Sequence, residues 1–242
     1  EYNPFEVVKT NIIGAQNVID AALQSNVKKV MALSTDKAAA PINLYGASKL
    51  TSDKLFIAAN NYKGWHDIKF SVVRYGNVMG SRGSVIPFFH SLKDTGEIPI
   101  TDTRMTRFMI TLEQGVEFVL AAFEDSIGGE IYVKKIPSMN IVDLAKSVVP
   151  DAKHKIIGIR PGEKLHEQMI STEDSYHTFE YENYYKILPS IYNSSNESKR
   201  INGGKKCPEG FSYSSDTNTE WMSCETLQKW MESEFGSALT SK

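Results

Sequence analysis

The segment Ser34-Thr35-Asp36-Lys37, followed shortly by Tyr45-Gly46-Ala47-Ser48-Lys49, decides the fold of this chain. Tyr45 and Lys49 are four residues apart, so on a helix they share one face. A cation beside a phenol favours the phenolate and lowers the pKa of the phenol from about 10. The pair therefore predicts a base that takes a proton from an alcohol while a hydride leaves the same carbon. Asp36 and Lys37 add a second acid and a second base.

The flanking segments predict an α/β fold. Residues 27–33 are short and mostly apolar and lead into Ser34 and Thr35, which is typical of a buried parallel strand. Apolar residues recur at helical spacing over 44–60, and residues 70–75 have the composition of a second buried strand. Ligands of open α/β sheets bind beyond the carboxyl ends of the strands, which is where this pattern places both motifs.

These elements resemble the extended short-chain dehydrogenase/reductase superfamily: a strand ending in Ser-Thr, a Tyr-x-x-x-Lys helix, and a strand ending in Arg-Tyr-Gly-Asn-Val. The string Ser-Thr-Asp-Lys-Ala-Ala is similar to that of the inverting UDP-N-acetylglucosamine 4,6-dehydratases, which belong to a polysaccharide-biosynthesis family and open pseudaminic acid synthesis. Retaining dehydratases usually carry Asp-Glu here, and 4-epimerases carry small residues. The similarity continues through residues 74–77, 82–85, 99–102, 105–108, 160–167 and 214–218. Ala40 departs from the Asn that is common in the family, and we expect this change to be tolerated.

The resemblance implies a fold class and a division into domains. The expected fold is a partial Rossmann-like, doubly wound parallel sheet with its N-terminal strands absent, together with a smaller mixed α/β substrate-binding lobe. No Gly-rich turn precedes the tyrosine motif, so we expect roughly the first hundred residues of the family pattern, which hold the cofactor pyrophosphate, to be missing. Residues 1–90 are assigned to the C-terminal half of the cofactor-binding domain, and 91–242 mostly to the substrate-binding lobe and a C-terminal extension. A helix at 111–123 is expected to return to the first domain.

The resemblance also implies the chemistry of the five candidate catalytic residues, which are Thr35, Asp36, Lys37, Tyr45 and Lys49. Tyr45 takes the proton from the sugar 4-hydroxyl, Lys49 tunes Tyr45, and Thr35 hydrogen-bonds the same oxygen. The 4-ketone acidifies the proton on carbon 5, which Lys37 removes, while Asp36 protonates the departing 6-hydroxyl. Return of the hydride to carbon 6, and of a proton to the opposite face of carbon 5, gives an inverted 4-keto-6-deoxy UDP-sugar.

The same resemblance implies two sets of binding residues. The cofactor is NADP, with NAD as the alternative, and its expected contacts are Ser34, Tyr45, Lys49, Tyr75 and Val78. The expected contacts of the UDP-sugar are Asn77, Arg82, Ser84, Thr101, Arg107, Arg160 and Glu163. A guanidinium grips a diphosphate with two parallel hydrogen bonds, and a carboxylate suits ribose hydroxyls. No metal site is expected, because His166 and Glu167 lack the spacing of a helical zinc site.

Composition limits the function classes. The chain has 242 residues, of which 41% are hydrophobic, and a net charge of −2 with the two signs interspersed. This pattern indicates neither a nucleic-acid partner nor a membrane surface, and no apolar run approaches the roughly 18 residues of a membrane span. The two cysteines, Cys207 and Cys224, are expected to be reduced thiols in a cytoplasmic enzyme. Relatives assemble as dimers or hexamers, so a homo-oligomer is expected.

Two other functions stay open at this point. A 4-epimerase or a retaining 4,6-dehydratase would share the fold. A truncated, non-catalytic sugar-nucleotide-binding fragment belongs to a different class and would follow from loss of the Gly-rich half. We further expect the sheet-forming part to end before about residue 90, a hairpin or extended arm at 176–188, and helices over 4–25 and 140–149.

Overall fold

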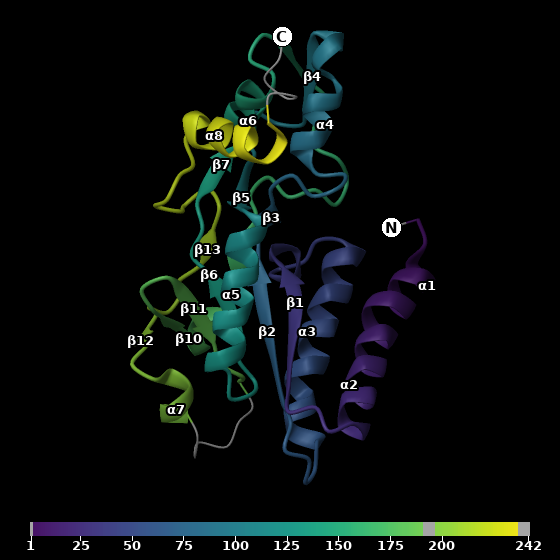
Figure 1. The fold of residues 1–242 in the computed structure, drawn as a ribbon, viewed down its shortest axis with the longest axis vertical. Coiled ribbons are helices and arrows are strands. Elements are labelled where there is room, and N and C mark those ends of the chain that lie inside the picture. The colour runs from purple at the N-terminus through teal and green to yellow at the C-terminus, as the bar shows by residue number, and fades with distance from the viewer. Residues whose placement is uncertain (1, 191–196, 237–242) are drawn as a thin grey trace. The chain divides into compact units, whose positions relative to one another are not determined.

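The chain divides into two compact units in the computed structural model, which describes residues 2–190 and 197–236 (Figure 1). Each unit is built from three segments of the chain. Unit 1 takes residues 1–75, 113–135 and 168–214, and unit 2 takes residues 76–112, 136–167 and 215–242.

Unit 1 is organised around a six-stranded sheet. Its strands, in spatial order, are β1 (Lys29–Thr35), β2 (Lys69–Tyr75), β6 (Ile131–Lys134), β11 (Tyr184–Ile187), β10 (Thr178–Glu180) and β12 (Lys205–Lys206). The first three strands are parallel, as in a Rossmann-like sheet, and the last three add on in antiparallel fashion. In the β1–β2 register Ser34 faces Arg74 and Thr35 faces Tyr75, so the carboxyl ends of these two strands coincide.

Two helices cover opposite faces of this sheet, α3 (Leu44–Tyr62) and α5 (Leu112–Asp125). Alternate residues of a strand point to opposite faces. In β2, Phe70 meets Phe56 of α3, with 6.5 Å between ring centroids. Val73, on the other face, packs in a cluster with Phe118 of α5. The parallel part of the sheet is therefore buried between helices, as its apolar sequence predicts.

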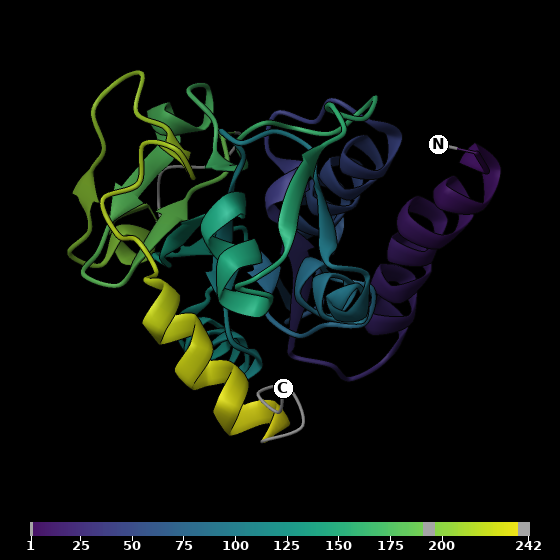
Figure 2. The same cartoon turned by 90° about the horizontal axis from the view of Figure 1, so that it is seen from above.

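The first helical segment of the chain is continuous. It consists of α1 (Pro4–Val7), a π-helical stretch (Val8–Ile13) and α2 (Gly14–Gln24). This helical segment, coloured purple, packs against α3, and Figure 2 shows it from the side. Its buried residues, Ala15, Ile19 and Ala22, lie at helical spacing. The predicted helix over 4–25 is confirmed.

The expectation that sheet formation ends before about residue 90 is wrong. The predicted hairpin at 176–188 is confirmed as β10 and β11, but β11 pairs with β6, and β6 pairs with β2. Strand pairing between residues far apart in sequence leaves no local pattern, which is why the sequence did not indicate it. The division into units also differs from the expected boundary near residue 90, because residues 168–214 belong with the main sheet and 76–90 do not.

Smaller elements complete unit 1. They are a 3₁₀ turn (Asp36–Ala38), β9 (Gln168–Ile170) paired with β13 (Tyr213–Ser214), a second 3₁₀ turn (Asp174–His177) and α7 (Glu197–Ile201). Cys207, in this unit, is a buried free thiol, and burial, aided by the charge of Glu180, raises its pKa to about 11.

Unit 2 has its own sheets and core. One sheet joins β3 (Asn77–Val78), β5 (Thr106–Ile110) and β7 (Ser138–Asn140), and a parallel pair joins β4 (Glu97–Ile100) to β8 (Lys153–Ile156). Its helices are α4 (Val85–Ser91), α6 (Ile141–Val148) and α8 (Cys224–Phe235), with a 3₁₀ turn at Lys93–Thr95. Asn140 caps α6 by accepting a hydrogen bond from the Val142 amide at 2.8 Å. Within residues 2–190 and 197–236, no helix is both long enough and apolar enough to cross a membrane.

Candidate active site

The carboxyl end of β1 brings an acid and a base into direct contact. The Thr35 hydroxyl donates to Asp36 Oδ1 at 2.8 Å, and Lys37 Nζ lies 3.0 Å from the same oxygen. The Asp36 side chain is buried, whereas the Lys37 side chain is one-third exposed. Asp36 Oδ2 has no hydrogen-bond partner within the described part of the chain. A buried carboxyl oxygen without a partner carries a desolvation cost, which a substrate hydroxyl could relieve.

Tyr45 and Lys49 lie in the first turns of α3, next to this turn. Asn43 caps the helix by accepting a hydrogen bond from the Gly46 amide at 2.7 Å, which sets where α3 begins. Tyr45 is 45% exposed, so its phenol is open to a ligand. Lys49 Nζ donates to the Leu33 carbonyl of β1 at 3.1 Å, which holds the helix against the strand end. Helix α3 also contacts the turn that carries Asp36 and Lys37.

Gly46 explains why the tyrosine motif reads Tyr-Gly. A Cβ atom at this position would lie 2.3 Å from the Lys37 carbonyl oxygen and 3.0 Å from the Pro41 Cβ. The absence of a side chain therefore lets the helix backbone approach the turn that carries the catalytic pair.

The predicted cofactor contacts fall mainly at these strand ends. Ser34, Tyr45, Lys49 and Tyr75 belong to unit 1, and Val78 belongs to unit 2. Burial, and then the nearby Tyr45, raise the pKa of Tyr75, so its phenol stays neutral at pH 7. The Lys49 ammonium and the Tyr75 hydroxyl, beside an exposed tyrosine, are chemically suited to a nicotinamide ribose, whereas Ser34 is buried and its hydroxyl donates to Asp53.

The predicted substrate contacts all fall in unit 2. Arg107 is buried, and its guanidinium donates to the carbonyls of Thr106, Leu165 and Lys164 at 2.7, 3.2 and 3.1 Å. Glu163 Oε1 lies 3.7 Å from Arg107 Nη2. Arg107 thus organises the loop that carries Glu163, and a phosphate would have to share a guanidinium that already has several partners.

The other residues of this set differ in their exposure. Asn77 Oδ1 and Ser84 Oγ are buried and have no hydrogen-bond partner within residues 2–190 and 197–236, so a ligand could satisfy them. Arg82 and Arg160 are exposed, and Thr101 is half-buried directly after β4. His166, which was not expected to be a metal ligand, forms a 2.8 Å hydrogen bond between its Nδ1 and the Thr106 hydroxyl.

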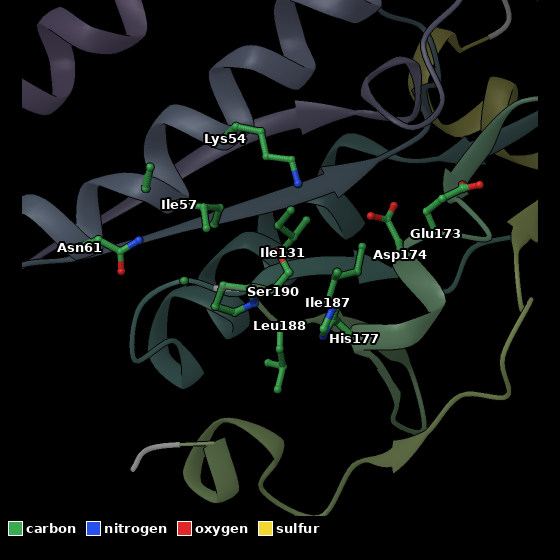
Figure 3. A pocket seen from close by; sticks show the side chains of 13 residues that line it. Lys54, Ile57, Asn61, Ile131, Glu173, Asp174, His177, Ile187, Leu188 and Ser190 are labelled. Carbon is green, nitrogen blue, oxygen red and sulfur yellow. The ribbon is translucent and has the colours of Figure 1, made fainter. Parts of the chain in front are cut away.

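Unit 1 also contains a pocket that none of the predicted residues lines. It has a volume of about 490 Å³ and lies between α3 and the segment 173–190 (Figure 3). Lys54 reaches into it from α3, and Glu173 and Asp174 line it on the other side, with the Glu173 carboxylate turned away from Lys54. Asp174 also lies close to a buried arginine, Arg74, at 3.6 Å.

Sequence reasoning missed Asp53 and gave Arg74 no role. The Ser34 hydroxyl donates to Asp53 Oδ2 at 2.8 Å, and Arg74 Nη2 lies 3.3 Å from the same oxygen. One signal was available: Asp53 follows Lys49 by the same four residues that separate Lys49 from Tyr45, so all three share a helix face.

A parallel strand end with an acid–base pair, beside a Tyr-x-x-x-Lys helix, defines an extended short-chain dehydrogenase/reductase. A family model described as "Polysaccharide biosynthesis protein" matches residues 1–189, and the chain belongs to this family. The UDP-N-acetylglucosamine 4,6-dehydratase (inverting) of Campylobacter jejuni strain 81-176 is 62% identical over 234 residues, which cover 94% of this chain and 70% of the relative. The UDP-glucose 4-epimerase of Rickettsia canadensis is 44% identical over 192 residues, covering 77% and 56%.

Solved structures agree on the fold. Pen from Bacillus thuringiensis superimposes with a TM-score of 0.84 at 37% identity and covers 97% of this chain and 71% of that one. The UDP-Glc/GlcNAc 4-epimerase of Campylobacter jejuni reaches a TM-score of 0.53 at 20% identity, covering 67% of this chain and 62% of that one, which supports the fold alone.

Proposed function

We propose that this chain carries the catalytic residues of a hydro-lyase that converts UDP-N-acetylglucosamine to an inverted 4-keto-6-deoxy UDP-sugar. The observation that carries the proposal is the contact between Lys37 Nζ and the buried Asp36 carboxyl, in a turn that packs against the helix exposing Tyr45. The 62% identity to the inverting dehydratase of Campylobacter jejuni supports the same reaction.

Each candidate catalytic residue of unit 1 has a role that fits its surroundings. Tyr45, exposed at the start of α3, accepts the proton of the sugar 4-hydroxyl. Lys37, partly exposed, removes the proton from carbon 5 after carbon 4 has become a ketone. Asp36 presents its unpartnered oxygen to the 6-hydroxyl that leaves as water. Thr35 was expected to hydrogen-bond the sugar 4-oxygen, but its hydroxyl donates to Asp36 at 2.8 Å, so we assign it the role of orienting Asp36.

The reaction is redox-neutral overall, so it needs a bound hydride carrier that is regenerated in each cycle. A nicotinamide cofactor supplies reversible hydride transfer when it is bound. Lys49 and Tyr75 would hold it, since they supply a cationic and a neutral donor near Tyr45, whereas the Ser34 hydroxyl is buried and already donates to Asp53. We favour NADP over NAD, and a homo-oligomer in the cytoplasm, on the basis of the resemblance. Equilibrium dialysis with NADP and NAD tests the choice of cofactor, and light scattering tests the oligomeric state.

The experiment uses the protein as its own cells produce it. It is mixed with UDP-N-acetylglucosamine and NADP in D₂O, and the sugar is followed by NMR. We expect loss of the 6-hydroxyl, a 4-keto product and deuterium at carbon 5 with inverted configuration. Retained configuration would identify a retaining dehydratase, and binding without turnover, seen by calorimetry, would identify a non-catalytic sugar-nucleotide-binding protein.

Lys37→Ala should abolish formation of the 4-keto-6-deoxy product, because no other amine in the turn removes the carbon 5 proton. Oxidation at carbon 4, which depends on Tyr45, should survive in part. The matched control is Lys28→Ala, directly before the start of β1, where the ammonium forms an exposed 3.7 Å ion pair with Asp67. Normal product from Lys37→Ala would rule out the assigned base.

A 4-epimerase is the second candidate function, favoured by the 44% identity to the Rickettsia canadensis enzyme. An epimerase inverts carbon 4 only, so its product would keep the 6-hydroxyl and take up no deuterium at carbon 5. The contact between Lys37 and the buried Asp36 favours the dehydratase, because an epimerase has no elimination step for a second acid and base to carry out.

A further inference from the structure

We infer that Asp53 is a positioning residue, which holds the catalytic end of β1 and the Tyr45–Lys49 helix in fixed register through Ser34 and Arg74. This inference rests on the proposed function, and it assigns a role to a residue outside the sets that bind substrate or cofactor.

Two hydrogen bonds join α3 to the end of β1. Lys49 Nζ donates to the Leu33 carbonyl at 3.1 Å, and one helical turn later Asp53 accepts the Ser34 hydroxyl at 2.8 Å. Two successive turns of α3 therefore form hydrogen bonds with two successive residues of β1. The next strand residue is Thr35, which hydrogen-bonds Asp36, so any slip at Ser34 moves the acid–base pair relative to Tyr45.

Asp53 and Arg74 form a buried ion pair. The side chains of Asp53 and Arg74 are each only 2% exposed, and they lie 3.3 Å apart. Arg74 also donates to the Met169 carbonyl at 2.8 Å, which ties β9 to the same point. A buried pair of this kind strongly resists the removal of one partner, because the other charge is then left uncompensated. The buried Asp53–Arg74 pair therefore fixes the position of Ser34 at the end of β1 more firmly than an exposed ion pair would.

A second carboxylate, Asp174, also approaches Arg74. Asp174 Oδ2 lies 3.6 Å from Arg74 Nη1, and its side chain is 25% exposed in the wall of the pocket in Figure 3. The Asp174 carboxylate can be solvated from the pocket, whereas Asp53 cannot be solvated. Asp53 is therefore the member of the network that fixes the arginine, and we expect Asp174→Asn to have the smaller effect.

The chain supplies a matched control for Asp53. Glu130 is also a fully buried carboxylate that accepts a serine hydroxyl, from Ser71 at 2.8 Å, and faces an arginine, Arg200, at 3.7 Å. Glu130 therefore also forms a hydrogen bond with the main sheet, but its partner Ser71 lies near the start of β2, away from the carboxyl ends of the strands that carry the catalytic residues. Glu130 additionally accepts the backbone amides of Ile127 and Gly128 at 3.2 and 2.9 Å. Glu130→Gln therefore disturbs at least as many local hydrogen bonds as Asp53→Asn, so a larger loss of kcat in Asp53→Asn reports its position beside the catalytic strand end.

The test compares both variants in the protein as its cells produce it, well below the melting temperature of each. Asp53→Asn should lower kcat by about tenfold to a hundredfold with KM changed less than about twofold, since a small misplacement of reacting groups costs rate. Glu130→Gln should leave kcat within about twofold of the parent. Equal kcat losses in the two variants, or an unchanged kcat in Asp53→Asn, would overturn the inference.

Hydrogen exchange gives a second readout that does not depend on turnover. Asp53→Asn should speed exchange of the backbone amides at residues 34–37 and leave those near Ser71 unchanged, and Ser34→Ala should do the same more weakly. If the parent protein makes no 4-keto sugar, the proposed function fails while the exchange comparison still decides whether Asp53 fixes the strand end. Unchanged exchange at residues 34–37 in both variants would contradict the positioning role.

Discussion

At Gly46 the helix of the tyrosine motif packs closely against the turn of the acid–base pair. A methyl group there would meet the Lys37 carbonyl oxygen at 2.3 Å, which is closer than atoms can approach. Gly46→Ala should therefore displace the turn, destabilise the protein by about 1–3 kcal/mol and impair turnover. Urea unfolding and product assays measure the two effects.

The control for this prediction is another helical glycine. Gly115 lies inside α5 and is buried, and nothing lies within 4 Å of the position that a methyl group would take there. Gly115→Ala should stabilise the protein by about 0.5–1 kcal/mol, because alanine loses less backbone entropy in a helix. If both alanine variants shift stability in the same direction, close approach is not the reason for Gly46.

Ala40 adopts a backbone conformation that alanine disfavours. Its φ is +42°, in the left-handed region where Asn is enriched, and it is exposed. Ala40→Asn should stabilise the protein by about 0.5–1 kcal/mol in urea unfolding. The same substitution at exposed Ala121, in the middle of α5, should destabilise it, since Asn is a poorer helix former than Ala. A loss of stability in Ala40→Asn would contradict this explanation.

At the scale of elements, a buried lysine fastens the late strand β11 to helix α5. Lys186 is 2% exposed and lies 2.7 Å from Asp125 Oδ2, which also accepts the Tyr132 hydroxyl at 2.7 Å. Burial alone would raise the pKa of Asp125, but the hydrogen bonds from Lys186 and Tyr132 outweigh it and hold the pKa below its usual value. This Lys186–Asp125 joint adds a side-chain tie between β11 and α5 to the backbone pairing of β11 with β6.

The joint makes stability depend on pH. A carboxyl group whose folded-state pKa is depressed stabilises the fold above its unfolded pKa of about 3.9 and loses this contribution as the pH falls through the folded value. Lys186→Met should lower the free energy of unfolding at pH 7 by about 1–3 kcal/mol. The difference from the parent should shrink as the pH falls below about 4.

Urea unfolding at several pH values checks this, with Lys135→Met as the control. Lys135 forms a 2.8 Å ion pair with the more exposed Glu180, and such pairs contribute only about 0–1 kcal/mol. A pH-independent loss in Lys186→Met would mean that packing, and not the charge of Asp125, accounts for the effect.

Local elements were predictable from the sequence, and the contacts between them were not. The strands before Ser34 and Gly76 and the helix that carries Tyr45 follow from apolar runs and spacings within a few residues. The Ser34–Asp53 bond joins residues 19 apart, and the Arg74–Met169 bond joins residues 95 apart. No periodicity spans such distances, so the sequence located the catalytic pair but not the buried charges that support it.

At the scale of the whole molecule, the main sheet needs strands from all three segments of unit 1. Strand β2 is bordered by β1 and by β6, which lies beyond residue 130. A fragment of residues 1–90 should therefore remain largely unfolded, because one side of β2 would lose its partner and the apolar face that meets α5 would be exposed. Poor dispersion in its amide NMR spectrum, beside good dispersion for the 242-residue chain, would bear this out. A cooperatively folded fragment would contradict the observed sheet order.

The chain passes between the two units five times, since each unit is assembled from three segments in alternation. Recombination that joins two parental genes at one or two points cannot exchange either unit whole. A chimera with a foreign unit 2 would need three separate inserted cassettes, one for each of its segments. Under the proposed function, changes of sugar preference are therefore expected to accumulate as scattered point substitutions in residues 76–112, 136–167 and 215–236, and directed evolution should diversify those stretches together.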